Sequence, residues 1–188
     1  MPELKLSTEI SASVWKVVLW RALTAVVFAA LTIFWQEPSA AFVAYAVAAV
    51  LLVSAKFTWD YARNDSAPAY LKAPMAIECA AWLVAAIIIV LIPQPLVIGI
   101  AAAAVFALSG VLDLLLWLRH RSDYLPLKDQ LMTGLVQLGI GVSMMFVLSM
   151  DAHAIGGVVG GGMVIIGVFL LISALGYRHD AKSTSDSR

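Results

Sequence analysis

Six long apolar runs restrict the possible folds of this chain more than any other feature of its sequence. A helix needs about 20 mostly apolar residues to cross roughly 30 Å of hydrocarbon. With 62% hydrophobic and only 13% charged residues, the chain is far more apolar than a water-soluble domain. We therefore predict an all-α, polytopic membrane protein with six transmembrane helices. The runs span residues 14–35, 39–59, 73–92, 95–118, 130–149 and 152–176.

The distribution of basic residues predicts the orientation of these helices. All 12 Lys and Arg residues lie on or near one set of run ends, and none lies in the three short turns that join the runs in pairs. Basic residues accumulate on the cytoplasmic side of membrane proteins. We therefore expect cytoplasmic termini and external turns, with a cytoplasmic segment 1–13, a transmembrane domain 14–178 and a disordered polar tail 179–188.

A constant interval relates the three pairs of runs. Pro95 follows Pro38 by 57 residues, and the third short turn follows Pro95 by the same interval. We expect three repeated helical hairpins that enter the membrane from the same side, at about 14–59, 73–118 and 130–176. Alternatively, three hairpins with loops of similar length would give a near-constant spacing without duplication.

Four charged residues within or at the ends of these runs follow the same interval. It relates Arg21 to Glu78, and Lys56 to Asp113. Charge is expensive inside a bilayer, so a carboxylate there needs a partner or a proton. We predict an intramembrane charge layer in which Arg21 pairs with Glu78 and Lys56 lies near Asp113. In the alternative, the two basic side chains extend along their own stems to the lipid headgroups.

The sixth run contains two overlapping Gly-x-x-x-Gly patterns, formed by Gly156, Gly157, Gly160 and Gly161. Small residues at this spacing let helices approach closely in lipid. The patterns predict a packing surface within the chain. A homo-oligomer interface or a surface for a membrane-protein partner is the alternative.

Asp151 and His153 lie in the third turn, on the expected outer side. Histidine titrates near neutral pH, so this turn is a candidate pH-sensitive site, with ordinary solvated surface as the alternative. No cluster of side chains has the spacing of metal ligands, and no arrangement of Ser, His and acid predicts a hydrolase. We expect no catalytic residues, no metal and no cofactor, and a lipid bilayer rather than nucleic acid as the partner.

Several short segments of the chain match the motifs of a known family. They are Trp20-Arg21-Ala22, Phe34-Trp35-Gln36-Glu37-Pro38, Glu78-Cys79, Ser109-Gly110-Val111-Leu112-Asp113, and Gly167 with Arg178. These segments resemble the HdeD-like family of small bacterial membrane proteins, whose founding member is associated with acid resistance. The likeness extends over residues 14 to 178. Ala22 and Cys79 replace family glycines, and Lys56 replaces what is more often an acid.

The resemblance implies a multi-pass protein of the bacterial inner membrane with no established catalysis. We expect a non-enzymatic protein with a structural or acid-stress protective role in the envelope. A small-molecule or ion transporter or channel is the alternative, although transporters usually place polar groups near the bilayer midplane. A membrane subunit of a larger complex is also compatible. An intramembrane enzyme would need a convergent polar cluster, which only Arg21, Glu78 and Asp113 could supply.

Overall fold

A computed structural model of the protein describes residues 2–35, 37–63, 67–121 and 127–183. All six helices in these residues are long and apolar enough to cross a membrane, which confirms the predicted all-α fold with six candidate membrane spans. The helices are α1 (Pro2–Phe34), α2 (Ala40–Ala62), α3 (Ala69–Leu91), α4 (Pro95–His120), α5 (Leu127–Val147) and α6 (Ala152–Ser183).

Local signals explain where the helices after the short turns begin. Ser39 caps α2 by accepting a 3.2 Å hydrogen bond from the backbone N–H of Phe42. Pro95 opens α4 at the one position where a missing N–H costs little. Asp151 Oδ1 accepts a 2.9 Å hydrogen bond from the backbone N–H of Ala154 at the start of α6. The turns therefore stop one helix and start the next within a few residues.

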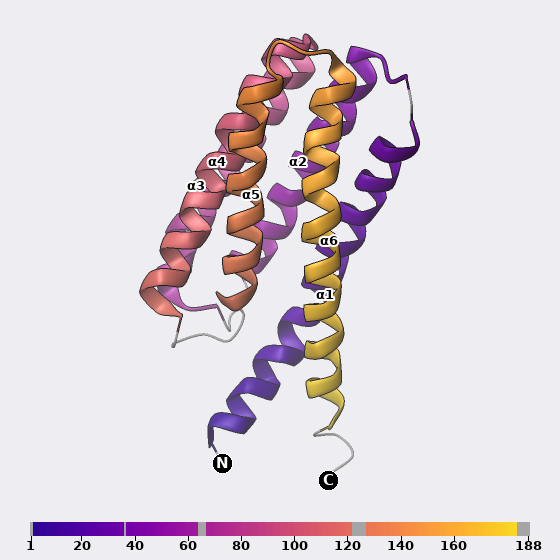
Figure 1. The fold of residues 1–188 in the computed structure, drawn as a ribbon. Coiled ribbons are helices and arrows are strands. Elements are labelled where there is room, and N and C mark those ends of the chain that lie inside the picture. Colours follow the sequence, from indigo (N-terminus) through magenta and orange to yellow (C-terminus); the bar gives the residue numbers. More distant parts are fainter. Residues whose placement is uncertain (1, 36, 64–66, 122–126, 184–188) are drawn as a thin grey trace.

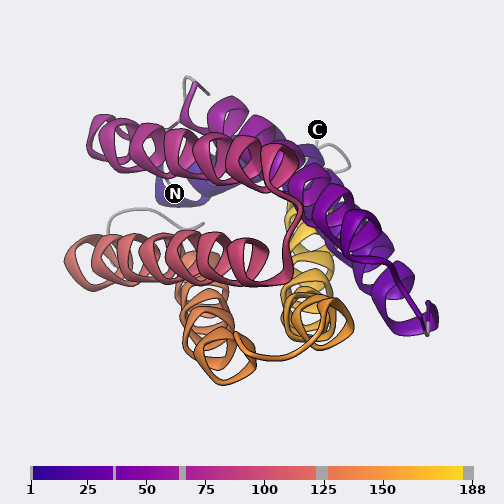
Figure 2. The ribbon, with the colours of Figure 1, turned by 90° about the horizontal axis from the view of Figure 1, so that it is seen from above.

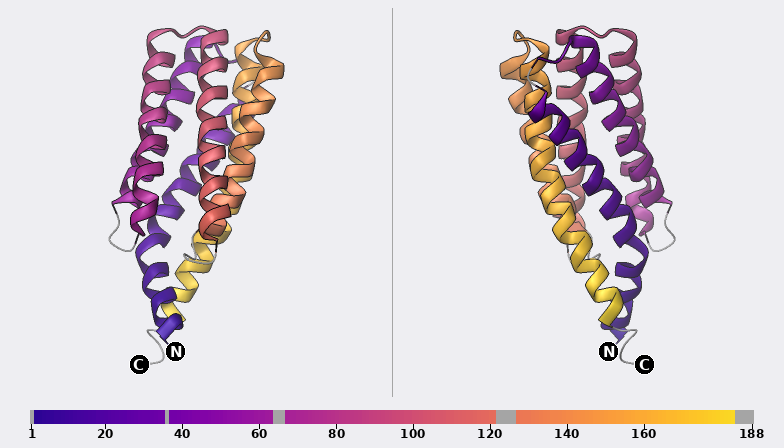
Figure 3. Two further views of the ribbon diagram at one scale, coloured as in Figure 1. Left: turned by 90° about the vertical axis from the view of Figure 1, so that its left-hand side faces the viewer. Right: turned by 90° about the vertical axis from the view of Figure 1, so that its right-hand side faces the viewer.

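Helices α1 and α6 extend past the other four at the end of the bundle that holds both termini (Figure 1). They contain 33 and 32 residues, whereas the remaining helices contain 21 to 26. At about 1.5 Å per residue, the excess is about 9–18 Å. Figure 3 shows the two long helices converging at this end.

Two boundaries differ from the sequence-based expectation. Residues 2–13 belong to α1 rather than to a separate segment, and residues 179–183 continue α6 instead of forming a disordered tail. Continuous backbone hydrogen bonding along a helix already started by an apolar span explains both extensions. Residues 184–188 lie outside the described residues.

The helices form a closed ring in which each contacts the next along the chain and α6 contacts α1 (Figure 2). The most extensive contacts join α1 to α6, α2 to α3 and α4 to α5, which belong to different expected hairpins. Helices α2, α4 and α6 also contact one another, whereas within the described ranges α1, α3 and α5 contact only even-numbered helices. Packing between hairpins therefore holds the bundle together more than packing within them.

Small residues bring α4 and α5 into backbone contact. A Cβ atom added at Gly110 would lie 2.6 Å from the backbone nitrogen of Leu138 and 2.8 Å from the carbonyl oxygen of Gly134. A Cβ atom added at Gly141 would lie 2.8 Å from the backbone nitrogen of Ala107. Such close approach is how transmembrane helices gain packing energy in lipid. It also brings the polar side chains of α4 within reach of α5.

Large apolar side chains cover the outside of the bundle. Phe34, Phe146 and Leu91 expose 83%, 79% and 73% of their surface. A soluble monomer rarely shows so much contiguous apolar surface, whereas the acyl chains of a bilayer would cover it. The structure thus suits contact with lipid on its outer faces and leaves the interior for the polar groups.

Candidate functional site: a buried polar core

Most of the buried polar side chains lie on α3, α4 and α5. We define the polar core as Arg21, Glu78, Ser109, Asp113, Thr133 and Gln137. All but Arg21 are at most 5% exposed, and Arg21 is half-buried. Polar groups enclosed among membrane helices are costly unless they satisfy one another. The arrangement of their partners therefore decides what this site can do.

Glu78 lies inside the bundle on α3 with 5% of its surface exposed. Its Oε1 atom accepts a 3.2 Å hydrogen bond from Trp82 Nε1, one turn further along the helix. Ser109 of α4 lies beside the carboxyl group, but its hydroxyl group has no hydrogen bond of ordinary geometry. The positive charge of Arg21 attracts Glu78 from α1, although the two side chains form no direct ion pair. The predicted neighbours therefore interact, but not through the predicted contact.

Asp113 lies on the face of α4 that meets α5, with 4% of its surface exposed. Its Oδ2 atom is 3.1 Å from Thr133 Oγ1. A Cβ atom at Gly134 would lie 2.9 Å from Asp113 Cβ, so only glycine leaves room for this approach. Arg21 attracts Asp113 and Glu78 repels it, which places both acids in the field of one guanidinium group.

Arg21 lines a small internal cavity of about 30 Å³ together with Thr58, Trp82 and Gln137. A cavity of this size holds about one water molecule. Arg21 makes no hydrogen bond to the described residues, and the side-chain oxygen of the 2% exposed Gln137 has no partner there either. The position of Arg21 favours the predicted interior role over contact with lipid headgroups.

Asp129, in the first turn of α5, is an additional site residue that the sequence reading missed. Its two carboxylate oxygens accept hydrogen bonds from Ser173 Oγ at 2.7 Å and from Tyr177 OH at 2.8 Å, both on α6. Arg21 and the adjacent Lys128 attract it. Ser173 and Tyr177 are four residues apart and therefore lie on one face of a helix. This spacing was the sequence signal for a pair of hydroxyl donors to an acid on a neighbouring helix.

The expectation that Lys56 lies near Asp113 is wrong. Lys56 forms an ion pair with Asp60, one turn later on α2, and its side chain is 67% exposed. Its interaction is therefore a local one on the helix surface, because a partner at the next turn is closer than any acid across the bundle. The charge layer contains Arg21, Glu78 and Asp113 without Lys56.

The two glycine patterns of α6 face in different directions. A Cβ atom at Gly156 would contact Val43 of α2 at 3.5 Å, and one at Gly160 would collide with Thr32 of α1. Added Cβ atoms at Gly157 and Gly161 would meet nothing within 4 Å. The 156/160 pattern thus packs within the chain, and the 157/161 pattern faces outward.

Asp151 and His153 lie at the end of the bundle opposite the termini, and both are exposed. Asp151 caps α6 through its hydrogen bond to the N–H of Ala154. This contact gives Asp151 a structural role at the helix start. In the described ranges, no group of three or more His, Cys, Asp or Glu side chains is placed to hold a metal ion.

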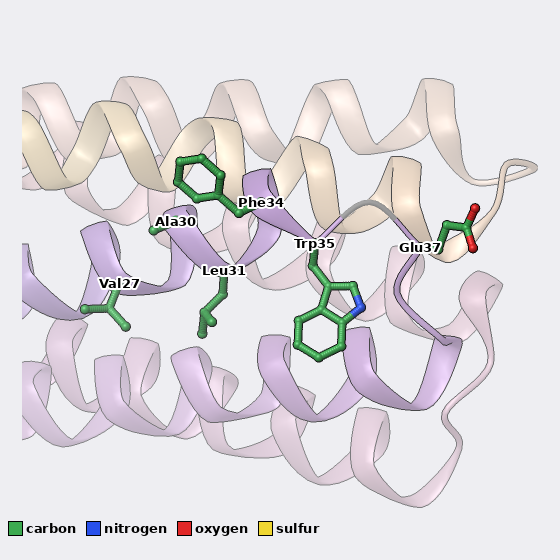
Figure 4. A pocket seen from close by; sticks show the side chains of 6 residues that line it. All are labelled: Val27, Ala30, Leu31, Phe34, Trp35 and Glu37. Atoms are coloured by element: carbon green, nitrogen blue, oxygen red, sulfur yellow. The ribbon is translucent and has the colours of Figure 1, made fainter.

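A large hollow lies outside the polar core, on the side of α1. It has a volume of about 710 Å³ and is open to the surroundings (Figure 4). Most of its lining is apolar and faces out of the bundle, where acyl chains would fill it. The lining residues are Val27, Ala30, Leu31, Phe34, Trp35 and Glu37.

Comparisons with protein-family models, with curated proteins and with solved structures find no match for this chain. The resemblance to the HdeD-like family therefore rests on the short motifs alone.

Proposed function

We propose that the chain is a non-enzymatic, multi-pass protein of the bacterial inner membrane that resembles the HdeD-like family and has a structural or acid-stress protective role in the envelope. The observation that carries this proposal is the enclosure of the polar core. Its polar groups face one another, and the cavity beside them, at about 30 Å³, has room for water but not for a larger substrate.

The proposed repeat and orientation agree with this function. The three most extensive helix contacts join neighbouring hairpins in the same way, and the even-numbered helices meet at the centre. Three duplicated hairpins around an axis normal to the membrane would give such a pattern. With the basic ends in the cytoplasm, α1 and α6 extend beyond the bundle on the cytoplasmic side.

A strain that lacks the chain tests the protective role. Its survival after acid challenge is expected to fall relative to the parent and to return when the wild-type chain is supplied from a plasmid. A chain with Gly110→Leu, which forces α4 and α5 apart, is expected not to restore survival. Equal survival of the parent and the deletion strain would contradict the proposal.

A transporter or channel is the second candidate, because polar side chains and a water-sized cavity lie inside the bundle. Vesicles containing the purified chain separate the two functions. Ser54 also lines this cavity. A solute or ion flux above that of empty vesicles, and lost on filling the cavity with Ser54→Trp, would favour transport. Vesicles as tight as empty ones would favour the structural role.

The outward-facing Gly157 and Gly161 are compatible with a subunit role or a homo-oligomer. Purification from native membrane in mild detergent addresses this alternative, because a stable partner would co-purify. Loss of the partner with Gly161→Leu, but not with Val84→Leu on the exposed side of α3, would assign it to this face.

A further inference from the structure

Glu78 and Asp113 are two buried acids that share one positively charged neighbour, Arg21. Each is nine-tenths or more buried, each repels the other, and one guanidinium group attracts both. The charged groups that act on Asp113 are Arg21 of α1 and Glu78 of α3, and the acid of α5 is Asp129 in its first turn. Two carboxylates balanced by Arg21 leave one excess negative charge inside the bundle, which is costly in low dielectric.

The hydrogen bonds of Thr133 bear on whether Asp113 carries a proton. Its hydroxyl group has one hydrogen but three acceptor oxygens nearby: the carbonyl oxygen of Asp129 at 3.0 Å, Asp113 Oδ2 at 3.1 Å and the carbonyl oxygen of Gln130 at 3.5 Å. A threonine inside a helix commonly donates to the carbonyl four residues earlier, which here is Asp129. The contact with Asp113 then lacks a hydrogen unless the carboxyl group supplies it.

The hydrogen bonds of Asp129 differ from those of Asp113. Both of its carboxylate oxygens accept from hydroxyl donors, Ser173 and Tyr177, and Lys128 is adjacent. Both carboxylate oxygens of Asp129 therefore have a donor without a proton on the acid itself, and the adjacent cation balances a negative charge there. The unbalanced acid is therefore in the Glu78 and Asp113 pair.

Two buried amide oxygens of α5 also lack a donor. Among the described residues, the side-chain oxygens of Gln130 and Gln137 have no hydrogen-bond partner. Gln137 lines the cavity next to Arg21. A metal cation is disfavoured at that position, because the guanidinium group already occupies the cavity wall and repels it. A proton bound to a carboxyl group needs no such space, and it adds a hydrogen-bond donor.

We propose that the pair Glu78 and Asp113 binds one proton at neutral pH, carried by Asp113, which donates it to Thr133 Oγ1. The proton comes from water and forms an O–H bond on Asp113 Oδ2. The remaining carboxylate, Glu78, is then balanced by Arg21 and accepts from Trp82. This inference does not depend on the proposed function.

Infrared spectroscopy of the full chain in phospholipid vesicles tests the proposal, because a protonated carboxyl group has its own C=O band, which shifts in heavy water. At neutral pH the wild-type chain is expected to show the band of one protonated carboxyl group. Both Asp113→Asn and Glu78→Gln are expected to remove it, since either leaves one carboxylate balanced by Arg21. Arg21→Gln is expected to raise its intensity about twofold, because both acids then need a proton.

Two matched controls assign the band. Asp129→Asn removes a buried acid of α5, and Asp151→Asn removes an exposed one; neither is expected to change the band. Circular dichroism identifies any variant that does not fold, and titration of the wild-type chain to alkaline pH gives an independent loss of one proton. Absence of the band at neutral pH would overturn the proposal. So would its persistence in Glu78→Gln, its loss in Asp129→Asn, or its removal by sodium ions at constant pH.

Discussion

Tyr177 OH donates a 2.8 Å hydrogen bond to Asp129 Oδ2, which joins α6 to α5 across 48 residues of chain. Tyr177 is 2% exposed, so the bond lies in a protected position. Ser173 donates to the other oxygen of the same carboxylate. These two hydrogen bonds hold the end of α5 nearest the termini against α6, beside the polar core.

Removal of the Tyr177 hydroxyl group is expected to weaken this junction. Tyr177→Phe should lower the free energy of unfolding by about 1.5–3 kcal/mol, the usual range for a hydrogen bond to a charged group. Thermal unfolding in detergent micelles measures the change. Tyr45→Phe is the matched control, because Tyr45 is 56% exposed on the outside of α2. Equal effects of the two substitutions would contradict a stabilising role for the hydrogen bond.

Close packing of α4 against α5 predicts a strong response to one added methyl group. Gly110→Ala would place Cβ against the backbone of Leu138 and Gly134, which cannot move aside without parting the helices. We expect a loss of about 1–3 kcal/mol of stability, as for other overpacked sites. Gly139→Ala on α5 is the control, because its Cβ would meet nothing within 4 Å. Denaturation that leaves Gly110→Ala as stable as this control would be inconsistent with the packing described.

The effect of substituting a glycine of α6 should depend on the direction in which that glycine faces. Gly162→Ala would collide with Ile140 of α5, whereas Gly161→Ala points into open space. We expect Gly162→Ala to destabilise the bundle and Gly161→Ala to be neutral or stabilising by up to about 1 kcal/mol, since alanine favours helix over glycine. Thermal unfolding of the two neighbouring variants makes the comparison. A reversed order would show that α6 is rotated relative to the present arrangement.

The Lys56 and Asp60 ion pair is expected to contribute little. Both side chains are at the helix surface, at 67% and 37% exposure, and such pairs are worth about 0–1 kcal/mol. Lys56→Gln should therefore change stability far less than Arg21→Gln, which removes the basic group that attracts both Glu78 and Asp113. A double-mutant cycle of Lys56 with Asp113 should give no coupling. A sizeable coupling energy would restore Lys56 to the charge layer.

A double-mutant cycle of Arg21→Gln and Glu78→Gln measures the coupling energy between these two residues of the charge layer. Because the guanidinium group attracts Glu78 without touching it, we expect a coupling of about 0.5–1.5 kcal/mol, near the lower end for interacting residues. Exchange of the two charges should recover only part of the loss, since a glutamate at position 21 would repel Asp113. Complete recovery would indicate an isolated pair.

The number of candidate membrane spans, and the residues that begin the helices after the short turns, can be read from the sequence. Length and hydropathy decide whether a segment can cross a bilayer, and Ser39, Pro95 and Asp151 act on their own helix through the backbone next to them. Such effects are local and can be read along the chain. Glu78 and Asp113 were also identified from sequence, because a short acidic side chain in an apolar span must face the interior.

The partners that these residues meet could not be read from the sequence and follow from the packed bundle. Lys56 pairs with Asp60 instead of Asp113, Arg21 acts on three acids without contacting them, and Asp129 reaches Tyr177. The physical reason is that partner choice depends on how each helix is rotated and how closely it approaches its neighbours. Side-chain volumes at Gly110, Gly134 and Gly141 set that approach only when the facing helix is in place.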